Sequence, residues 1–126
     1  MEKYKKTFGN LGEDAAVKYL KKKRYIILER NFNVHGGEID IIAKKGDYVI
    51  FVEVKTRSGE EYGSGLEAVN YTKQQRMKKA AQVYLMRLGD VPARFDVVAV
   101  NGFMDGKKFK TEEIEHIENA FWIEFE

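Results

Sequence analysis

The residue types that bind divalent metal ions occur close together in the first half of the chain. Asp40 is followed, after twelve residues, by Glu53-Val54-Lys55. The dipeptide Gly46-Asp47 between them is a favoured hairpin turn, and the register that it sets places Asp40 directly opposite Glu53, unless a bulge shifts it by one residue. Opposed carboxylates repel each other unless a proton or a cation lies between them, and divalent cations take carboxylate oxygens readily. The spacing therefore predicts a metal site.

Two more acidic residues are candidates for the same site. The hairpin register places Glu38 opposite Lys55, so we expect Glu38 to hold the Lys55 ammonium group. Glu13 falls on the flank of the apolar face of a predicted helix, where a carboxylate needs a partner that a metal ion could supply. The alternative for the strand residues is a cross-strand salt-bridge cluster of Glu38, Glu53 and Lys55. The alternative for Glu13 is a side chain that reaches solvent from the edge of the core, or a carboxylate favoured by the helix dipole.

The amino-acid composition limits which metal ions the chain could bind. The chain of 126 residues has no cysteine and two histidines, which excludes thiol catalysis, iron–sulfur clusters and cysteine-based zinc sites. A metal would be held mainly by carboxylates, so Mg²⁺ or Mn²⁺ is expected. The length suits one domain over residues 1–126. The N-terminus does not resemble a secretory signal, and the longest apolar run, Tyr48–Val52, is too short to span a bilayer, so we expect a cytoplasmic protein without membrane contact.

Charge is distributed unevenly along the chain. Residues 111–126 carry six glutamates and no lysine or arginine, which leaves 22 basic against 14 acidic residues in residues 1–110. A basic body favours an anionic partner such as nucleic acid, although a solvated surface with an acidic tail is the simpler alternative. Candidate phosphate contacts are Lys73, Arg76 and Lys79 on a predicted helix and Arg57 in a Gly-rich loop over residues 56–65, where Tyr62 could stack on a base.

The elements that must position these residues are predicted from apolar spacing. Helices are expected over residues 9–23 and from a capping box at Thr72 and Gln75 to Gly89. Strands are expected over residues 25–33, 38–43, 48–55 and 94–100, with a turn near Asp105-Gly106 and a last strand-like segment around 114–118. The order helix, three strands, helix, one or two strands predicts an α/β domain with a central mixed sheet flanked by helices.

These residues resemble a known enzyme superfamily. Asp40, Glu53 and Lys55, preceded by a helix that bears Glu13, resemble the motif of the PD-(D/E)XK nucleases, with Ile39 in place of the usual proline. More closely, the chain resembles the YraN-like family of small bacterial predicted endonucleases, which is related to archaeal Holliday junction resolvases. The matching stretches are Gly12-Glu13-Asp14-Ala15-Ala16, Gly37-Glu38-Ile39-Asp40, Val52-Glu53-Val54-Lys55-Thr56-Arg57, Arg94-Phe95-Asp96-Val97-Val98 and His116-Ile117-Glu118-Asn119-Ala120-Phe121.

The resemblance implies a restriction-endonuclease-like fold and metal-dependent hydrolysis of DNA, with structure-selective cutting like that of the resolvases. Asp40, Glu53 and Glu13 would bind Mg²⁺ (or Mn²⁺), and Lys55 would orient or activate the attacking water. Glu38 would support Lys55. DNA is favoured over RNA as the substrate, and a homodimer follows by analogy with resolvases. The alternative function is a non-catalytic nucleic-acid-binding or protein-interaction module built on a nuclease fold.

Overall fold

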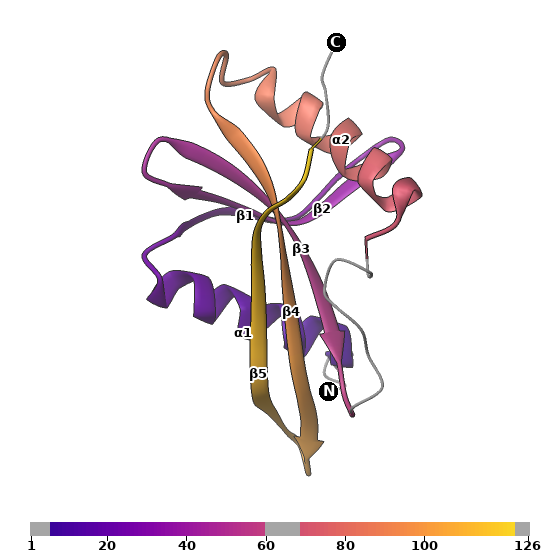
Figure 1. The fold of residues 1–126 in the computed structure, drawn as a ribbon. Coiled ribbons are helices and arrows are strands. Elements are labelled where there is room, and N and C mark those ends of the chain that lie inside the picture. Colours follow the sequence, from indigo (N-terminus) through magenta and orange to yellow (C-terminus); the bar gives the residue numbers. More distant parts are fainter. Residues whose placement is uncertain (1–5, 60–68, 123–126) are drawn as a thin grey trace, which may run out of the picture.

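Two helices and five strands make up the computed structural model, which describes residues 6–59 and 69–122 (Figure 1). In chain order they are α1 (Phe8–Lys22), β1 (Ile26–Val34), β2 (Gly37–Lys45), β3 (Tyr48–Arg57), α2 (Tyr71–Leu85), β4 (Ala93–Asp105) and β5 (Lys108–Phe121). The predicted order of helices and strands is confirmed. Tyr62 and most of the predicted Gly-rich loop lie outside the described residues.

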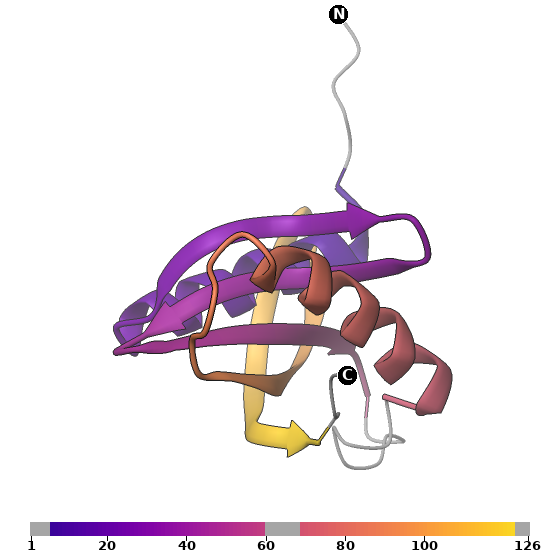
Figure 2. The same cartoon turned by 90° about the horizontal axis from the view of Figure 1, so that it is seen from above.

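The strands form one mixed sheet in the order β1-β2-β3-β4-β5. Neighbouring strands are antiparallel except β3 and β4, which are parallel and are joined by the crossover that contains α2. The two helices cover opposite faces of the sheet (Figures 1 and 2). This arrangement is an α/β fold with the predicted restriction-endonuclease-like core.

The central strand β3 is apolar on both faces because a helix covers each one. Val49 and Phe51 pack in the cluster under α2, whereas Ile50 and Val52 pack in the cluster under α1. All four side chains are almost completely buried. The strand therefore holds the residues that follow Val52 in a fixed position at its carboxyl end.

The hairpin between β2 and β3 has the predicted register over most of its length. Lys45 pairs with Tyr48, Ala43 with Ile50, and Ile41 with Val52. Gly46 in the turn has φ +60°, a conformation that glycine adopts without strain. The paired residues end at Ile41 and Val52, one position before the two candidate carboxylates.

The second helix begins and ends earlier than predicted. Asn70 caps α2, since its side chain accepts the Lys73 N–H, and the expected capping box at Thr72 and Gln75 is therefore wrong. Asparagine caps helices at least as well as threonine, so the helix begins one residue before Thr72. The α-helix ends at Leu85, and a tighter turn leads to Gly89, which has φ +81°.

The last two strands are longer than predicted. They form an extended hairpin around the predicted turn, in which Gly106 has φ +64°. Charged and exposed residues dominate its outer part, so the apolar alternation that identifies a strand is missing there. No helix in the described part of the chain is long and apolar enough to cross a membrane.

Candidate functional site

The regular alternation of side chains along β2 is interrupted at Asp40. Side chains two apart in a regular strand share a face, yet Ile39 packs in the cluster under α2 and Ile41 in the cluster under α1. On the neighbouring strand β1, Asn31 has φ +53°, which is uncommon for a residue other than glycine. The Asp40 carboxylate accepts the backbone N–H of Val54 at 2.8 Å. This bond fixes Asp40 against β3 just beyond the last paired residues of the hairpin.

The predicted catalytic residues line one cavity of about 370 Å³. Asp40 comes from β2, Glu53 and Lys55 come from β3, and Glu13 comes from the first half of α1. The helix approaches β3 closely because residue 12 is glycine: a Cβ atom there would lie 2.0 Å from Thr56 Oγ1. The structure thus brings together four residues that are up to 42 positions apart in the sequence.

Asp40 and Glu53 form an electrostatically strained pair. Glu53 is 7% exposed, and burial together with the neighbouring Asp40 charge raises its pKa from 4.5 to about 8. Burial also raises the pKa of Asp40, although the Val54 N–H bond opposes this effect. The Oε1 atom of Glu53 is buried and makes no hydrogen bond with any residue in the ranges 6–59 and 69–122. A pair of this kind is stabilised by a proton or by a cation placed between the two carboxyl groups.

The donor set of the pair fits Mg²⁺ or Mn²⁺. Magnesium is commonly held by one or two carboxylates, with water and substrate phosphate completing its coordination. Glu13, the expected third ligand, lines the same cavity, but its Oε1 accepts hydrogen bonds from Arg30 Nη2 at 2.7 Å and from Asn31 Nδ2 at 3.2 Å. Within residues 6–59 and 69–122, no three acidic or histidine side chains are close enough to hold a metal ion. The two carboxylates of Asp40 and Glu53 are therefore the core of the candidate metal site.

The expected contact between Glu38 and Lys55 is wrong. Glu38 Oε2 accepts a hydrogen bond from Lys73 Nζ at 3.1 Å, and Glu38 Oε1 lies 3.9 Å from Arg76 Nη2. The reason is that α2 passes directly over the start of β2, where a Cβ atom at Gly37 would lie 2.5 Å from the Arg76 carbonyl oxygen. Helix α2 therefore supplies the partners of Glu38, and Lys55 is exposed at the cavity.

Lys73 contacts a carboxylate of the site, Glu53, whereas the sequence indicated only a phosphate contact for this lysine. Its Nζ atom is 3.4 Å from Glu53 Oε2 as well as 3.1 Å from Glu38 Oε2. Burial lowers the pKa of Lys73, but the Glu53 and Glu38 carboxylates more than reverse this effect, and the pKa is raised overall. Lys73 is thus a charged counter-ion for Glu53, and only the docking of α2 over β2 reveals this role.

The sequence did not indicate Arg30 and Asn31. Arg30 Nη2 bridges Glu13 Oε1 and Asp14 Oδ1, each at 2.7 Å, and so ties β1 to α1. Asn31 adopts a left-handed conformation that asparagine tolerates better than most residues, and its side chain reaches Glu13. An arginine followed by an asparagine within a strand carries no recognisable signal by itself.

The remaining predicted phosphate contacts lie on two different elements, β3 and α2. Arg57 is at the end of β3, with Nη2 3.8 Å from Glu115 Oε1 on β5. Arg76 and Lys79 are exposed on α2, and Arg76 faces Glu38. Arg76 therefore lies beside Lys73, since both contact Glu38, whereas Arg57 lies on a different element.

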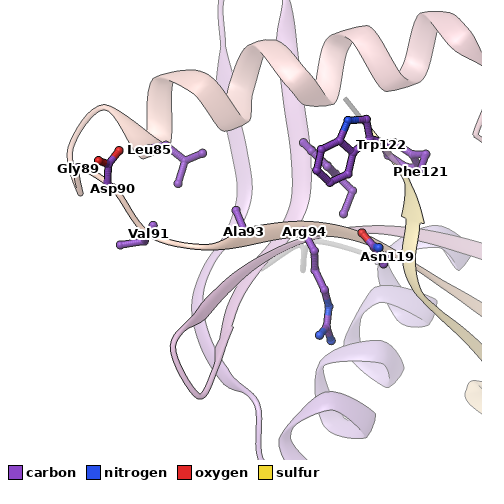
Figure 3. Close-up of a pocket in the computed structure, with 10 residues that line it drawn as sticks. Leu85, Gly89, Asp90, Val91, Ala93, Arg94, Asn119, Phe121 and Trp122 are labelled. Carbon is purple, nitrogen blue, oxygen red and sulfur yellow. The ribbon is translucent and has the colours of Figure 1, made fainter. Parts of the chain in front are cut away.

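A second cavity, of about 540 Å³, lies between the end of α2, the start of β4 and the end of β5 (Figure 3). It is lined by apolar residues such as Leu85 and Phe121, and by Trp122, which is 78% exposed. Arg94 points to the other side of β4 (Figure 3), where its guanidinium group donates to Asp96. Because this cavity has no pair of opposed carboxylates among its lining residues, the smaller cavity is the candidate active site.

Comparison with known proteins identifies one family. The family model described as uncharacterised protein family UPF0102 matches residues 12–100, which include Glu13, Asp40, Glu53 and Lys55. A UPF0102 protein of Thermodesulfovibrio yellowstonii is 47% identical over 115 residues, covering 90% of this chain and 95% of the relative. A UPF0102 protein of Clostridium kluyveri is 44% identical, covering 98% of this chain and all of the relative. The chain therefore belongs to the uncharacterised protein family UPF0102.

Proposed function

We propose that this protein is a metal-dependent endonuclease that hydrolyses phosphodiester bonds of DNA. The observation that carries the proposal is the Asp40–Glu53 pair. The buried oxygen Glu53 Oε1 has no hydrogen-bond partner among the described residues, and the pKa of Glu53 is raised to about 8. Such a pair destabilises the folded chain unless a cation or proton neutralises it. Residues that are unfavourable for folding tend to mark functional sites.

The chemistry follows from the residues around this pair. Asp40 and Glu53 would hold Mg²⁺ or Mn²⁺, which supplies a bound water of lowered pKa and neutralises charge on the phosphate. The Val54 N–H keeps the Asp40 carboxylate in place for this task. Lys55, exposed at the cavity, donates to the attacking water or to a phosphate oxygen as negative charge develops. Arg30 and Asn31 hold Glu13 at the edge of the site.

DNA is the proposed substrate because the body of the protein is basic and the residues resemble the resolvase motif. The resemblance also supports a branched DNA substrate and a two-fold homodimer that cuts two strands symmetrically. Phosphate contacts from Arg57, Arg76 and Lys79 would position the nucleic acid without reading its sequence. The charge of Lys73 is directed at Glu53 and Glu38, so its contribution is to the site itself.

A second candidate function is a non-catalytic nucleic-acid-binding module on the same fold. The salt bridge between Arg30 and Glu13 favours this function. Because Glu13 is already paired with Arg30, Asp40 and Glu53 are the two carboxylates left to bind a metal ion. The presence of Asp40, Glu53 and Lys55 at one cavity favours catalysis.

The test is an endonuclease assay on three labelled substrates: a four-way DNA junction, a linear duplex and a single strand. Each is incubated with Mg²⁺, with Mn²⁺ or with EDTA. We expect metal-dependent cutting with a preference for the junction. Asp40→Asn should abolish cutting, whereas Asp90→Asn, the same change at an exposed position away from the site, should retain it. Binding without cutting in every metal would select the non-catalytic function.

A further inference from the structure

The hairpin of β4 and β5 extends past the end of β3 (Figure 1). The last pair between β3 and β4 is Arg57 with Asn101. Beyond it, β4 continues to pair with β5, from Gly102–Thr111 to Asp105–Lys108. We call residues 102–111 the arm. At roughly 3.3 Å per residue, the four residues beyond Asn101 on β4 place the tip about 13 Å past the last β3 pair.

The arm is attached next to the candidate active site. The ring of Phe109 lies 5.3 Å, centroid to centroid, from the ring of Phe8, and Phe8 lines the candidate cavity. Gly102 permits this packing, because a Cβ atom there would lie 2.6 Å from the Phe109 ring. The position of the arm is therefore fixed relative to the start of α1, which forms one wall of the site.

The exposed surface of the arm combines apolar and basic side chains. Phe103 and Met104 are 43% and 42% exposed. Lys107, Lys108 and Lys110 are also exposed, and Asp105 is the one acidic residue of the arm, so its net charge is +2. The glutamates of β5 begin only after the arm, and one of them, Glu115, faces Arg57.

Two of these lysines and Asp105 share a face with Phe103. Residues paired across an antiparallel ladder lie on the same side of it, so Phe103 and Lys110 lie together, and Asp105 and Lys108 follow on that side. Met104 and Phe109 lie on the other side, toward Phe8. Phe103 is therefore presented to solvent with lysines beside it.

We propose that the arm binds the DNA substrate beside the bond that is cut, an inference that rests on the proposed nuclease function. Its three lysines contact backbone phosphates, and Phe103 packs against bases at an opened or branched step. Charge complementarity selects nucleic acid as the occupant, since phosphates match the lysines. Apolar wedges flanked by basic residues are a recurrent means of holding unstacked bases.

The arm is tested by the affinity of the full-length protein for labelled DNA in EDTA, measured by fluorescence anisotropy. The probes are a four-way junction and a duplex of matched sequence. Lys107→Ala, Lys108→Ala and Lys110→Ala are combined in one variant. The matched control combines Lys18→Ala, Lys21→Ala and Lys22→Ala, three exposed lysines of α1 outside the residues that line the site. Thermal melting followed by circular dichroism checks that both variants fold.

We expect the arm variant to bind DNA at least about tenfold more weakly than the wild type. The slope of log K against log salt should become less steep by about 2 to 3, because each lost phosphate contact removes about 0.9 from the slope for duplex DNA. The control should lose no more than about twofold. Phe103→Ala should keep the salt dependence and lose the preference for the junction over the duplex. Equal losses in the arm variant and the control, or no binding by the wild-type protein, would overturn the proposal.

The outcome separates the arm from the nuclease function. If the wild-type protein cuts DNA and the arm variant binds as tightly as the control, the arm proposal fails while the nuclease stands. If the arm variant alone loses affinity and no protein cuts DNA in Mg²⁺ or Mn²⁺, the nuclease proposal fails and the arm stands as a binding surface.

Discussion

Lys73 Nζ on α2 lies 3.4 Å from Glu53 Oε2 on β3, and this contact joins a helix on one face of the sheet to the candidate active site. The lysine is the cation that partly offsets the charge of a carboxylate pair in the metal-free protein. A metal ion bound by Asp40 and Glu53 would take over that role and leave the Lys73 ammonium available to a phosphate.

Lys73→Met should therefore destabilise the metal-free protein, by about 1 to 3 kcal/mol, because it leaves the buried carboxylates without their cation. Urea unfolding in EDTA measures the change, and a second titration in Mg²⁺ should show a larger gain from metal than the wild-type protein shows. Lys79→Met, an exposed position on the same helix, is the control. Equal losses in the two variants would mean that the contact with Glu53 contributes nothing.

Glu53→Gln should stabilise the metal-free protein near neutral pH. The folded pKa of Glu53, about 8, lies above its ordinary value of 4.5, so its favourable contribution is complete below about pH 4.5 and is lost as the pH rises to 8. The wild-type protein should become less stable by about 2 to 4 kcal/mol over this range, and the variant should not. Urea unfolding at several pH values in EDTA gives both curves. Parallel curves of stability against pH for the wild type and Glu53→Gln would contradict this assignment. Glu112→Gln, the same change at an exposed position, is the control.

Magnesium should raise the melting temperature of the wild-type protein, since a ligand that binds only the folded state stabilises it. At ten times the dissociation constant the gain is about 1.4 kcal/mol. Asp40→Asn should remove the gain and Asp90→Asn should retain it. A Mg²⁺-dependent shift of the same size in all three proteins would place the metal elsewhere.

Asp96 should determine the resistance of the fold to acid. Its buried carboxylate accepts hydrogen bonds from Arg94 Nε at 3.0 Å and from the Asn119 backbone N–H at 2.9 Å, and it lies 2.8 Å from His116 Nε2. Burial raises the pKa of Asp96, but His116 and Arg94 outweigh burial, and the pKa is lowered overall. The stability that Asp96 contributes is therefore present above its unfolded pKa and is lost as the pH falls through its lowered folded value.

Asp96→Asn should cost about 2 to 3 kcal/mol near neutral pH, because it removes a fully buried carboxylate that accepts hydrogen bonds from the half-buried Arg94 and from the Asn119 backbone. The loss should also loosen the end of β5, where Asn119 has φ +52° and the strand bends (Figure 2). Urea unfolding measures the loss of stability, and hydrogen exchange of the Asn119 amide reports the loosening. Asp105→Asn, exposed in the arm, should leave both unchanged.

The features of the site that are determined by residues close together in the sequence could be predicted. Gly46-Asp47 determines the turn, the turn determines the register, and the register brings Asp40 to the level of Glu53. Likewise, the alternate apolar residues Val49 and Phe51 on one face and Ile50 and Val52 on the other identify an interior strand whose carboxyl end carries Glu53.

The parts that depend on contacts between distant elements could not be predicted. The partner of Glu38 changes because α2 docks on Gly37, and no local pattern reports the docking position of a helix. The break at Asp40 and the left-handed Asn31 lie on neighbouring strands, and neither can be recognised from the residue types alone. The predicted N-cap of α2 was wrong for a local reason. Asn70 and Thr72 are both residues that cap helices well, and Asn70 is the one that caps α2.

In the proposed reaction, Asp40 and Glu53 hold a divalent metal ion with which the protein hydrolyses DNA. The most direct measurement is the single-turnover rate of cutting of a labelled four-way junction by excess protein in Mg²⁺, compared among the wild type, Asp40→Asn and Asp90→Asn. We predict measurable cutting by the wild type and by Asp90→Asn, and a loss of at least about a thousandfold in Asp40→Asn. Cutting by Asp40→Asn at the wild-type rate would contradict the claim, as would a wild-type protein that binds the junction and leaves it intact in both Mg²⁺ and Mn²⁺.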